Sequence, residues 1–202
     1  MGKQEYRVER IDAKDCAPLL ASYHYLTNVS KGFKSGFNVG LIKDNKVVGV
    51  CIFTGFPVPE LVVGLFGLDR TEQSGMWELS RLVLSPCAQK SEHNLAGWFV
   101  ARALNLLRNN MTVRAVLSYA DNDHHSGTVY KATGFSYYGL SAPKKDFWVK
   151  RPDGVFEKMS RGKTKGIEGE WRARSRKHRF LKVYDKTLTP RWLEVTPAGK
   201  GE

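Results

Sequence analysis

The segment that spans residues 76–138 constrains the fold more than any other, because its hydrophobic pattern changes period repeatedly. Residues 76–84 (MWELSRLVL) alternate apolar and polar side chains as a strand does, whereas residues 95–107 carry apolar side chains at helical spacing. Three shorter elements follow, a strand, a helix and a strand, at residues 113–119, 126–133 and 135–138. Strands that alternate with helices predict an α/β (α+β) domain in which helices flank a central mixed sheet.

The N-terminal part of the chain predicts further strands for this sheet. The expected elements are a strand at 6–11, a helix at 14–25 and a hairpin with strands at 37–42 and 47–53. The hairpin follows from two apolar, β-branched runs that flank the turn-forming pair Asp44-Asn45. Residues 61–68 are apolar and fit either a strand or a buried helical turn.

The composition of the chain limits its class and its compartment. With 202 residues and 42% hydrophobic side chains, the chain can bury one sizeable core, which excludes a disordered protein. The N-terminus has no apolar segment of signal-peptide length, and no run approaches the roughly 18 apolar residues of a membrane span. Cys16, Cys51 and Cys87 are an odd number of cysteines without metal-ligand spacing. These features predict a cytoplasmic protein without membrane segments.

Positive charge gathers at the C-terminal side of the predicted core. Lys and Arg exceed Asp and Glu by twelve in the whole chain, and residues 143–182 alone hold fourteen basic against five acidic residues. A polyanion is the expected partner, with nucleic acid as the first candidate and an anionic membrane surface as the second. We therefore expect a folded domain at 1–150, whose core ends near Trp148, and a basic DNA-contacting extension at 151–202. The side chains expected to contact phosphates are Lys144, Lys145, Arg172, Arg174, Arg176, Lys177 and Arg179.

Four consecutive motifs, ELSRLVL, LAGWFVARAL, VRAVLSYAD and GTVYKATGF, resemble the core of the GNAT acetyltransferase fold. The resemblance implies a GNAT-like catalytic domain at 1–150, with acetyl-CoA or a related acyl donor held where a central strand splays from its neighbour. Strand amides would pair with the pantetheine arm, and the pyrophosphate would lie at the next helix's N-terminus, whose N–H groups are free. The implied donor-binding residues are Leu82, Val83, Leu84, Ser91, Glu92, His93, Asn94, Leu95, Ala96 and Asn122. Of the family's glycine-containing loop pattern only Ala96 matches, and Asn94 replaces a glycine.

A narrower set of motifs resembles the phage Mom family over roughly residues 6–184. It comprises Tyr23-His24-Tyr25, ELSRL, the Asp121 that follows SYA, Tyr130 and the basic ending RARSRKHRF. Members of that family are DNA-modification proteins on a GNAT-like scaffold, and they convert adenine to N6-carbamoylmethyladenine so that host restriction enzymes fail to cut. The resemblance implies DNA and a small-molecule group donor as partners, in the host cytoplasm.

Five side chains are candidates for catalytic roles, His24, Tyr25 and Tyr130 through the resemblance, and each has a structural alternative. His24 and Tyr25 match a pair needed for acid/base chemistry or metal binding; otherwise they belong to an aromatic cluster that closes a helix. Tyr130 would protonate a departing thiolate, or is a core aromatic. Arg81 would bind a phosphate or a substrate carbonyl, or forms a surface ion pair. Asp121 would accept a proton or hydrogen-bond an amine nucleophile, or caps the DNDHHSG turn.

Three functions stay open on the sequence alone. The first is transfer of a group to the exocyclic amine of adenine in DNA, which requires the base to leave the stacked duplex. The residues on which that base would stack are Tyr23, Tyr25, Phe33 and Phe37. The second is an acetyl-CoA-dependent N-acetyltransferase that acts on a small amine or a protein, and the third is a non-catalytic DNA-binding protein. His24, Asp121 and a tyrosine would also suit iron, although no local ligand motif marks a metal site.

Overall fold

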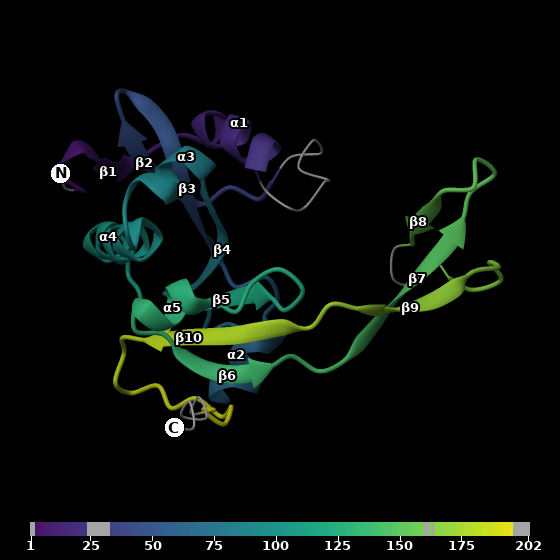
Figure 1. The fold of residues 1–202 in the computed structure, drawn as a ribbon. Helices are drawn as coiled ribbons and strands as arrows, with labels where there is room; N and C mark the ends of the chain where they lie inside the picture. Colours follow the sequence, from purple (N-terminus) through teal and green to yellow (C-terminus); the bar gives the residue numbers. More distant parts are fainter. Residues whose placement is uncertain (1–2, 24–32, 160–161, 163, 196–202) are drawn as a thin grey trace, which may run out of the picture.

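The computed structural model describes residues 3–23, 33–159, 162 and 164–195. These residues form a seven-stranded central sheet with helices on both faces, from which a separate three-stranded sheet projects (Figure 1). In spatial order the central sheet contains β1 (Arg7–Arg10), β2 (Phe37–Lys43), β3 (Lys46–Gly55), β4 (Met76–Leu84), β5 (Ala115–Asp121), β10 (Lys177–Val183) and β6 (Ser136–Leu140). The helices are η1 (Lys3–Glu5), α1 (Ala13–Tyr23), α2 (Glu60–Phe66), α3 (Pro86–Ser91), α4 (Leu95–Asn110) and α5 (Thr128–Ala132).

Neighbouring strands of the central sheet are antiparallel except for β4 and β5, which run parallel. Strand β3 shows how the two faces are filled. Its Phe53 belongs to a cluster with Phe99 of α4, whereas the adjacent Ile52 packs with Leu20 of α1. Successive side chains of a strand point to opposite faces, so a strand covered on both sides is apolar almost throughout. The prediction of a mixed sheet flanked by helices is confirmed.

Most expected elements are present with shifted ends. The hairpin of β2 and β3 turns at Asp44 and Asn45, which both have positive φ angles, as a two-residue hairpin turn requires. The apolar stretch at 61–68 is helical and forms α2, which ends at Gly67 in the left-handed conformation. Helix α3 was not expected from the sequence; Ser85 caps it by accepting a hydrogen bond from the Ala88 N–H.

Strand β10 is the largest departure from the expected layout. It pairs with β5 on one side and β6 on the other, so part of the expected extension at 151–202 lies inside the central sheet. Phe180 and Leu181 anchor β10 in the core. They are 0% and 1% exposed and belong to the hydrophobic clusters on the two opposite faces of the sheet. The core therefore does not end near Trp148, because β6 reaches β5 only through β10.

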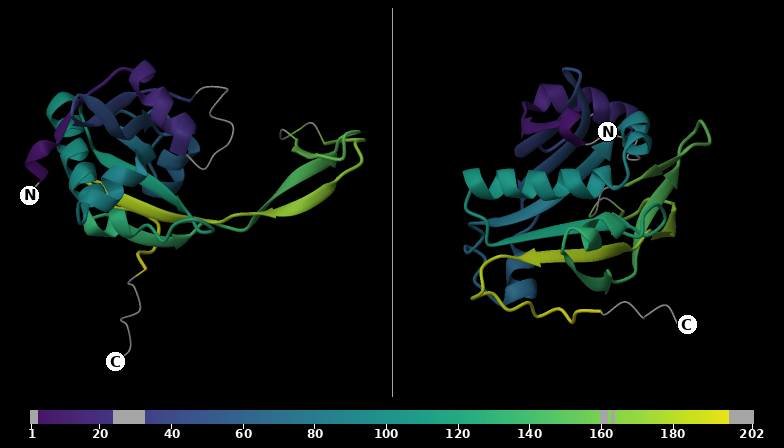
Figure 2. Two further views of the ribbon diagram at one scale, coloured as in Figure 1. Left: turned by 45° about the horizontal axis from the view of Figure 1, so that its top comes forward. Right: turned by 60° about the vertical axis from the view of Figure 1, so that its left-hand side comes forward.

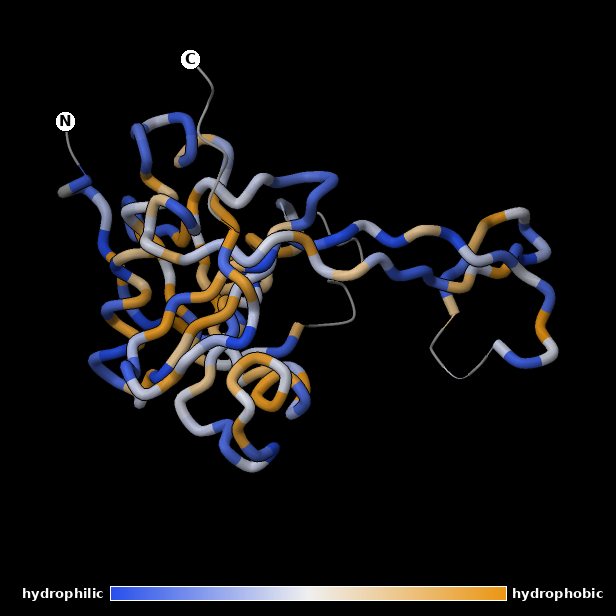
Figure 3. Tube along the Cα trace, turned by 90° about the horizontal axis from the view of Figure 1, so that it is seen from below, coloured by the Kyte–Doolittle hydropathy of each residue, from blue (hydrophilic) through white to orange (hydrophobic). Residues whose placement is uncertain are grey.

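The three-stranded sheet, which we call the arm, consists of β7 (Lys144–Lys150), β8 (Phe156–Lys158) and β9 (Glu170–Arg174), in the order β8-β7-β9. It is inserted between β6 and β10 and extends away from the core (Figure 2). Hydrophobic segments are concentrated in the strands of the core, whereas the arm is largely hydrophilic (Figure 3). None of the described helices is long and apolar enough to cross a membrane.

Candidate active site

The parallel strands β4 and β5 separate toward their carboxyl ends. Their pairing runs from Met76 and Ala115 to Leu79 and Ser118 and stops there, although β4 continues to Leu84. At the same point the register of β4 against β3 shifts, because Ser80 is an extra residue between the pairs of Leu79 and Arg81. Such a bulge bends and twists a strand locally. The bend opens the sheet and leaves one edge of β4 without a partner strand.

A cavity of about 320 Å³ lies in this opening. Its walls come from residues 80–84 of β4, 119–121 of β5 and 125–130 of α5 and the turn before it. Tyr23, Gln89 and Ala96 complete the lining. Arg81, Asp121 and Tyr130, which the sequence predicted for catalysis from three separate segments, therefore surround one cavity.

Tyr130 is held by aromatic neighbours within the wall of the cavity. It is 9% exposed, and its ring lies 5.7 Å from that of Phe135 and 5.2 Å from that of Phe180. Gly127 begins α5 with a φ of +72°, and a Cβ there would lie 2.2 Å from the Phe180 ring. The glycine thus lets α5 approach β10 closely, and this approach fixes the position of Tyr130. Tyr130 is thus a core aromatic, as the structural alternative expected, and it also lines the cavity.

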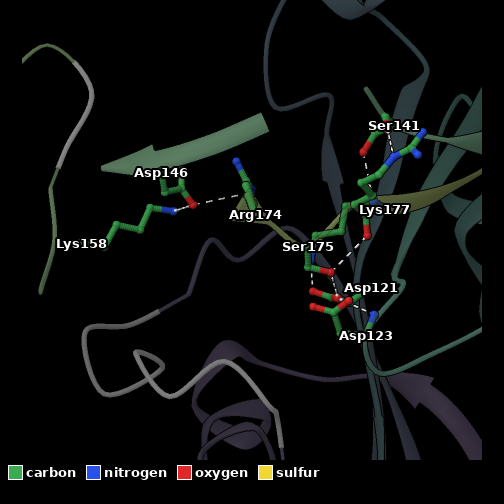
Figure 4. A network of polar contacts seen from close by, with 9 residues as sticks. Asp121, Asp123, Ser141, Asp146, Lys158, Arg174, Ser175 and Lys177 are labelled. Carbon is green, nitrogen blue, oxygen red and sulfur yellow. Dashed lines mark hydrogen bonds and ion pairs between the residues drawn. The ribbon is translucent and has the colours of Figure 1, made fainter. Parts of the chain in front are cut away.

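Asp121 forms a polar network with the chain that leads from the arm into β10 (Figure 4). Its carboxylate accepts hydrogen bonds from the Ser175 hydroxyl and the Asp123 N–H and makes an ion pair with Lys177. Burial alone would raise the pKa of Asp121, but the hydrogen bonds from Lys177, Ser175 and Asp123 lower it to about 2. The carboxylate is therefore charged at neutral pH and is a weak proton acceptor, suited to orienting a group by hydrogen bonding.

The turn after β5 is organised by the same residue. The backbone carbonyl of Asp121 accepts hydrogen bonds from the N–H groups of His124 (3.0 Å) and His125 (2.7 Å). The Asp121 side chain caps this turn, which is not helical, by accepting a hydrogen bond from the Asp123 N–H at 3.1 Å, and Asp121 also lines the cavity. His125 lines the cavity as well.

Arg81 brings positive charge to the β4 side of the cavity. Its Nη1 donates to the Ser80 carbonyl oxygen at 2.7 Å, and its buried Nε has no hydrogen-bond partner among the described residues. Glu78 lies nearby; burial raises its pKa, against the opposing charges of Arg81 and Lys34. Burial and the charge of Glu78 also raise the pKa of Tyr119, which lines the cavity, to about 12. Arg81 is thus a half-buried residue of the cavity wall.

The expected donor-binding residues divide into two groups. Leu82, Val83, Leu84 and Ala96 line the cavity, with the three β4 residues on the edge beyond the last pair with β5. The residues outside its lining are Ser91, Glu92, His93, Asn94, Leu95 and Asn122. Leu95 is a core residue at 1% exposure, and Ser91 hydrogen-bonds the Tyr6 hydroxyl at 2.8 Å.

The start of α4 shows how Asn94 replaces a glycine. Asn94 has φ 55° and ψ 30°, in the left-handed region that glycine favours and asparagine tolerates. A Cβ on Gly97 would lie 2.4 Å from the Asn94 side-chain oxygen, so the next glycine admits this side chain. The loop thus keeps the backbone turn that a glycine would give.

Several of the basic residues expected to contact phosphates are bound within the protein. Lys177 pairs with Asp121, Arg176 donates from Nε to the Ser141 carbonyl at 2.7 Å, and Arg179 lies over the Trp192 ring at 4.4 Å. The remaining expected residues, Lys144, Lys145, Arg172 and Arg174, belong to the arm.

The remaining predictions concern a catalytic His-Tyr pair, aromatic stacking surfaces and a metal site. His24 and Tyr25 lie outside the described residues. Tyr23 is 50% exposed and lines the cavity, whereas Phe37 is 3% exposed inside β2 and cannot be a stacking surface. Within the part of the chain that is described, no group of three His, Cys, Asp or Glu side chains is placed to hold a metal ion.

The sequence did not single out Ser80, Tyr119, Gln89 or the turn at 125–129 as cavity residues. It also did not pair Lys177 with Asp121. No sequence pattern predicts the β-bulge at Ser80. In contrast, the glycine at position 127 of the GTVYKATGF motif indicates that α5 packs closely against β10.

The splayed parallel pair, the cavity between its strands and the helix that starts beside it define a fold of the GNAT acetyltransferase class. An IAA acetyltransferase from Bacillus cereus has a TM-score of 0.54 at 13% identity, over 89% of this chain and 99% of that chain. An acetyltransferase from Bacillus subtilis in complex with CoA has a TM-score of 0.52 at 13% identity, with the same two coverages. A GNAT-family acetyltransferase from Desulfovibrio desulfuricans has a TM-score of 0.52 at 13% identity, over 88% of this chain and 98% of that chain.

Sequence comparison identifies the family within this class. The profile of the Mom protein family matches residues 5–193, and the chain therefore belongs to the Mom protein family. A search of curated protein sequences finds no match.

Proposed function

We propose that this protein is a DNA-modifying transferase that adds a carbamoylmethyl-type group to the N6 amine of adenine and so protects DNA from host restriction enzymes. The observation that supports it most is the cavity between β4 and β5, which gathers Arg81, Asp121 and Tyr130 in a chain of the Mom family. The partners of the reaction are DNA and a small-molecule group donor.

The three side chains have complementary chemistry for such a transfer. The adenine amine is a poor nucleophile, because its lone pair is delocalised into the ring, so it must be held in line with the donor. Asp121, charged at neutral pH, hydrogen-bonds the amine hydrogens and orients them. Arg81 has a buried Nε without a partner among the described residues and binds a carbonyl or phosphate oxygen. Tyr130 supplies a hydroxyl proton to the leaving group.

The donor in this proposal binds as an acyl-CoA or a related thioester would. Attack of the N6 amine on a thioester carbonyl expels the thiolate and gives an N6-acyl amide, whereas a carbamoylmethyl group is joined to N6 through its CH2 carbon. The donor of a carbamoylmethyl group must therefore carry its leaving group on that carbon, and the two adducts differ in connectivity. The edge of β4 at Leu82, Val83 and Leu84 is free of β5 and offers backbone groups to an extended pantetheine arm. The N-terminus of α4, next to Ala96, suits a pyrophosphate. The Bacillus subtilis neighbour, which is bound to CoA, supports the same arrangement through the shared fold.

An ordinary acetyl-CoA-dependent N-acetyltransferase is the second candidate, and that CoA-bound neighbour is the observation in its favour. The basic arm would then serve another purpose. A non-catalytic DNA-binding protein is the third outcome that an experiment must separate.

Mass spectrometry of nucleosides distinguishes the three functions. DNA is digested from cells that express the protein, from cells with an empty vector and from cells that express Tyr130→Phe. A new adenine adduct in the first sample alone supports the proposal. Unmodified DNA together with acetylated small amines or proteins supports the acetyltransferase, and tight DNA binding without either product supports the third function. Purified protein, duplex DNA and acetyl-CoA then test that donor directly.

A further inference from the structure

The strand register of the arm places most of its charged side chains on one face. Residues directly opposite each other in an antiparallel pair share a face, as do alternate residues along a strand. Lys144 is opposite Arg174, Asp146 is opposite Arg172, and Trp148 is opposite both Glu170 and Lys158. Lys150 is opposite Phe156. The cations of this face, which we call the cationic face, are Lys144, Lys150, Lys158, Arg172 and Arg174.

Side-chain contacts agree with this assignment. The Asp146 carboxylate lies 2.7 Å from Lys158 Nζ and 4.0 Å from Arg174 Nε, across three strands of the arm. The Arg172 guanidinium lies 3.8 Å from the centre of the Phe156 ring. Asp146 is thus placed between cations, and the aromatic ring holds Arg172 against the sheet.

The opposite face of the arm has a different character. Its residues include Lys145, Phe147 and Trp171, and Lys145 is its one cation within β7, β8 and β9. Phe147 is 7% exposed, and its ring lies 5.2 Å from that of Trp171. This face is aromatic and stabilises the arm, whereas the cationic face carries five cations against the two acids Asp146 and Glu170.

The cationic face continues toward the candidate active site. Arg174 is followed by Ser175, whose hydroxyl hydrogen-bonds Asp121 in the cavity wall. Figure 4 shows both clusters, the one of Asp146, Lys158 and Arg174 and the one of Ser175, Asp121 and Lys177, which are linked along the chain because Arg174 precedes Ser175. A polyanion that lay along the arm would therefore end beside the cavity.

We infer that the arm binds the phosphate backbone of duplex DNA through its cationic face, and that its opposite face does not contact DNA. This inference rests on the proposed function and specifies its binding surface. The five cations lie on one face of the arm according to the strand register, and contacts between such side chains and phosphates position a protein on DNA without distinguishing its sequence. Lys144 and Lys150 are exposed, and they mark the two ends of β7.

Two adjacent lysines give a matched test, because Lys144 and Lys145 have the same charge and neighbouring positions but point to opposite faces. The variant Lys144→Gln/Lys150→Gln removes two charges from the cationic face. The control Lys145→Gln/Lys186→Gln removes one from the opposite face and one from the exposed turn after β10. Binding of the full-length variants to a short duplex of unrelated sequence is measured against salt concentration.

The first variant should lower the slope of log affinity against log salt by about 1.8, since each lost phosphate contact removes about 0.9. The control should keep the wild-type slope. Equal losses in both variants would mean that net charge and not the face matters, and no loss in the first would place the DNA elsewhere. Tighter binding to a duplex RNA of the same length would identify a different partner. Face-specific binding without an adenine adduct would refute the proposed function and leave this inference standing.

Discussion

Lys177 and Asp121 stand directly opposite each other in the antiparallel register of β10 and β5, and their side chains form an ion pair at the edge of the cavity. The pair joins two residues that the sequence assigned to different tasks, DNA contact and catalysis. Lys177 is therefore part of the site that holds Asp121, and its removal would change the charge of the cavity wall.

This ion pair predicts a dependence of stability on pH. The pKa of Asp121 is lowered from 3.8 to about 2, so its charge stabilises the folded state above about pH 4. That contribution disappears as the pH falls from 3.8 to 2. Asp121→Asn should cost on the order of 2 kcal/mol at pH 7, because Lys177 loses its partner. Urea unfolding at pH 7, 4 and 3 measures both effects.

Asp185 gives an internal reference for that experiment. Hydrogen bonds from Thr187 and Arg114 lower its pKa to about 2 as well, so it titrates in the same range. Asp121→Asn should keep the part of the acid destabilisation that Asp185, Asp69 and Glu5 cause and lose the part that Asp121 causes. If the variant lost stability with acid as steeply as the wild type, Asp121 would not be ion-paired in solution.

Tyr130→Phe should reduce adenine modification by about 10²–10⁴-fold and leave DNA affinity unchanged, because it removes a proton donor and keeps the ring packed on Phe135 and Phe180. Quantified nucleosides give the rate. Tyr137→Phe is the control, since its hydroxyl hydrogen-bonds His178 at 2.8 Å outside the cavity lining. A folded Tyr130→Phe protein with full activity would remove this hydroxyl from the mechanism.

Asn94 tests whether the start of α4 binds the donor. Asn94→Gly should bind coenzyme A as well as the wild type, because glycine adopts a φ of 55° freely. Asn94→Val should weaken binding roughly tenfold, since a β-branched residue pays about 1–2 kcal/mol in the left-handed region. Calorimetric titration with coenzyme A measures both. An unaffected Asn94→Val variant would place the pyrophosphate away from this helix.

The arm can be removed at its base. Ser141 and Lys177 are joined by a hydrogen bond from the Ser141 N–H to the Lys177 carbonyl at 2.8 Å, so an Asn-Gly turn can replace residues 142–176. This variant should fold cooperatively and lose most of its DNA affinity. Truncation after residue 150 should fail to fold, because it deletes β10. Circular dichroism during thermal unfolding separates the two variants, and a folded truncation would contradict the place of β10 in the core.

Local signals in the sequence were sufficient for most of the fold. The hairpin at Asp44-Asn45 and the helix from Leu95 have periodic patterns that neighbouring residues alone determine. Strand β10 was missed because its apolar pair, Phe180 and Leu181, lies among cations whose total charge dominated the interpretation. The two strands with which β10 pairs, β5 and β6, are also distant in sequence, and a local sequence pattern does not indicate pairing between distant segments.

Residues of the candidate site could be predicted where they lie in a strand or helix that the sequence itself predicts, because that element determines where the side chain is placed. Asp121 at the end of β5, Arg81 in β4 and Tyr130 in α5 are cases of this kind. The partners of Asp121 were not predictable, because Ser175 and Lys177 reach it from more than fifty positions further along the chain. Phosphate contacts could not be separated from internal ion pairs by counting charges, as Lys177 and Arg176 illustrate.

The position of β10 between β5 and β6 also affects how the protein is made. A ribosome adds residues in order, so β5 and β6 leave it while the strand that joins them, Lys177–Val183, has not yet been synthesised. During that interval one edge of β5 is unpaired and β6 has no partner strand, and unpaired strand edges can pair with other chains. Completion of the sheet must therefore follow synthesis of the whole arm, which makes rapid emergence and docking of β10 a condition for a good yield of folded protein.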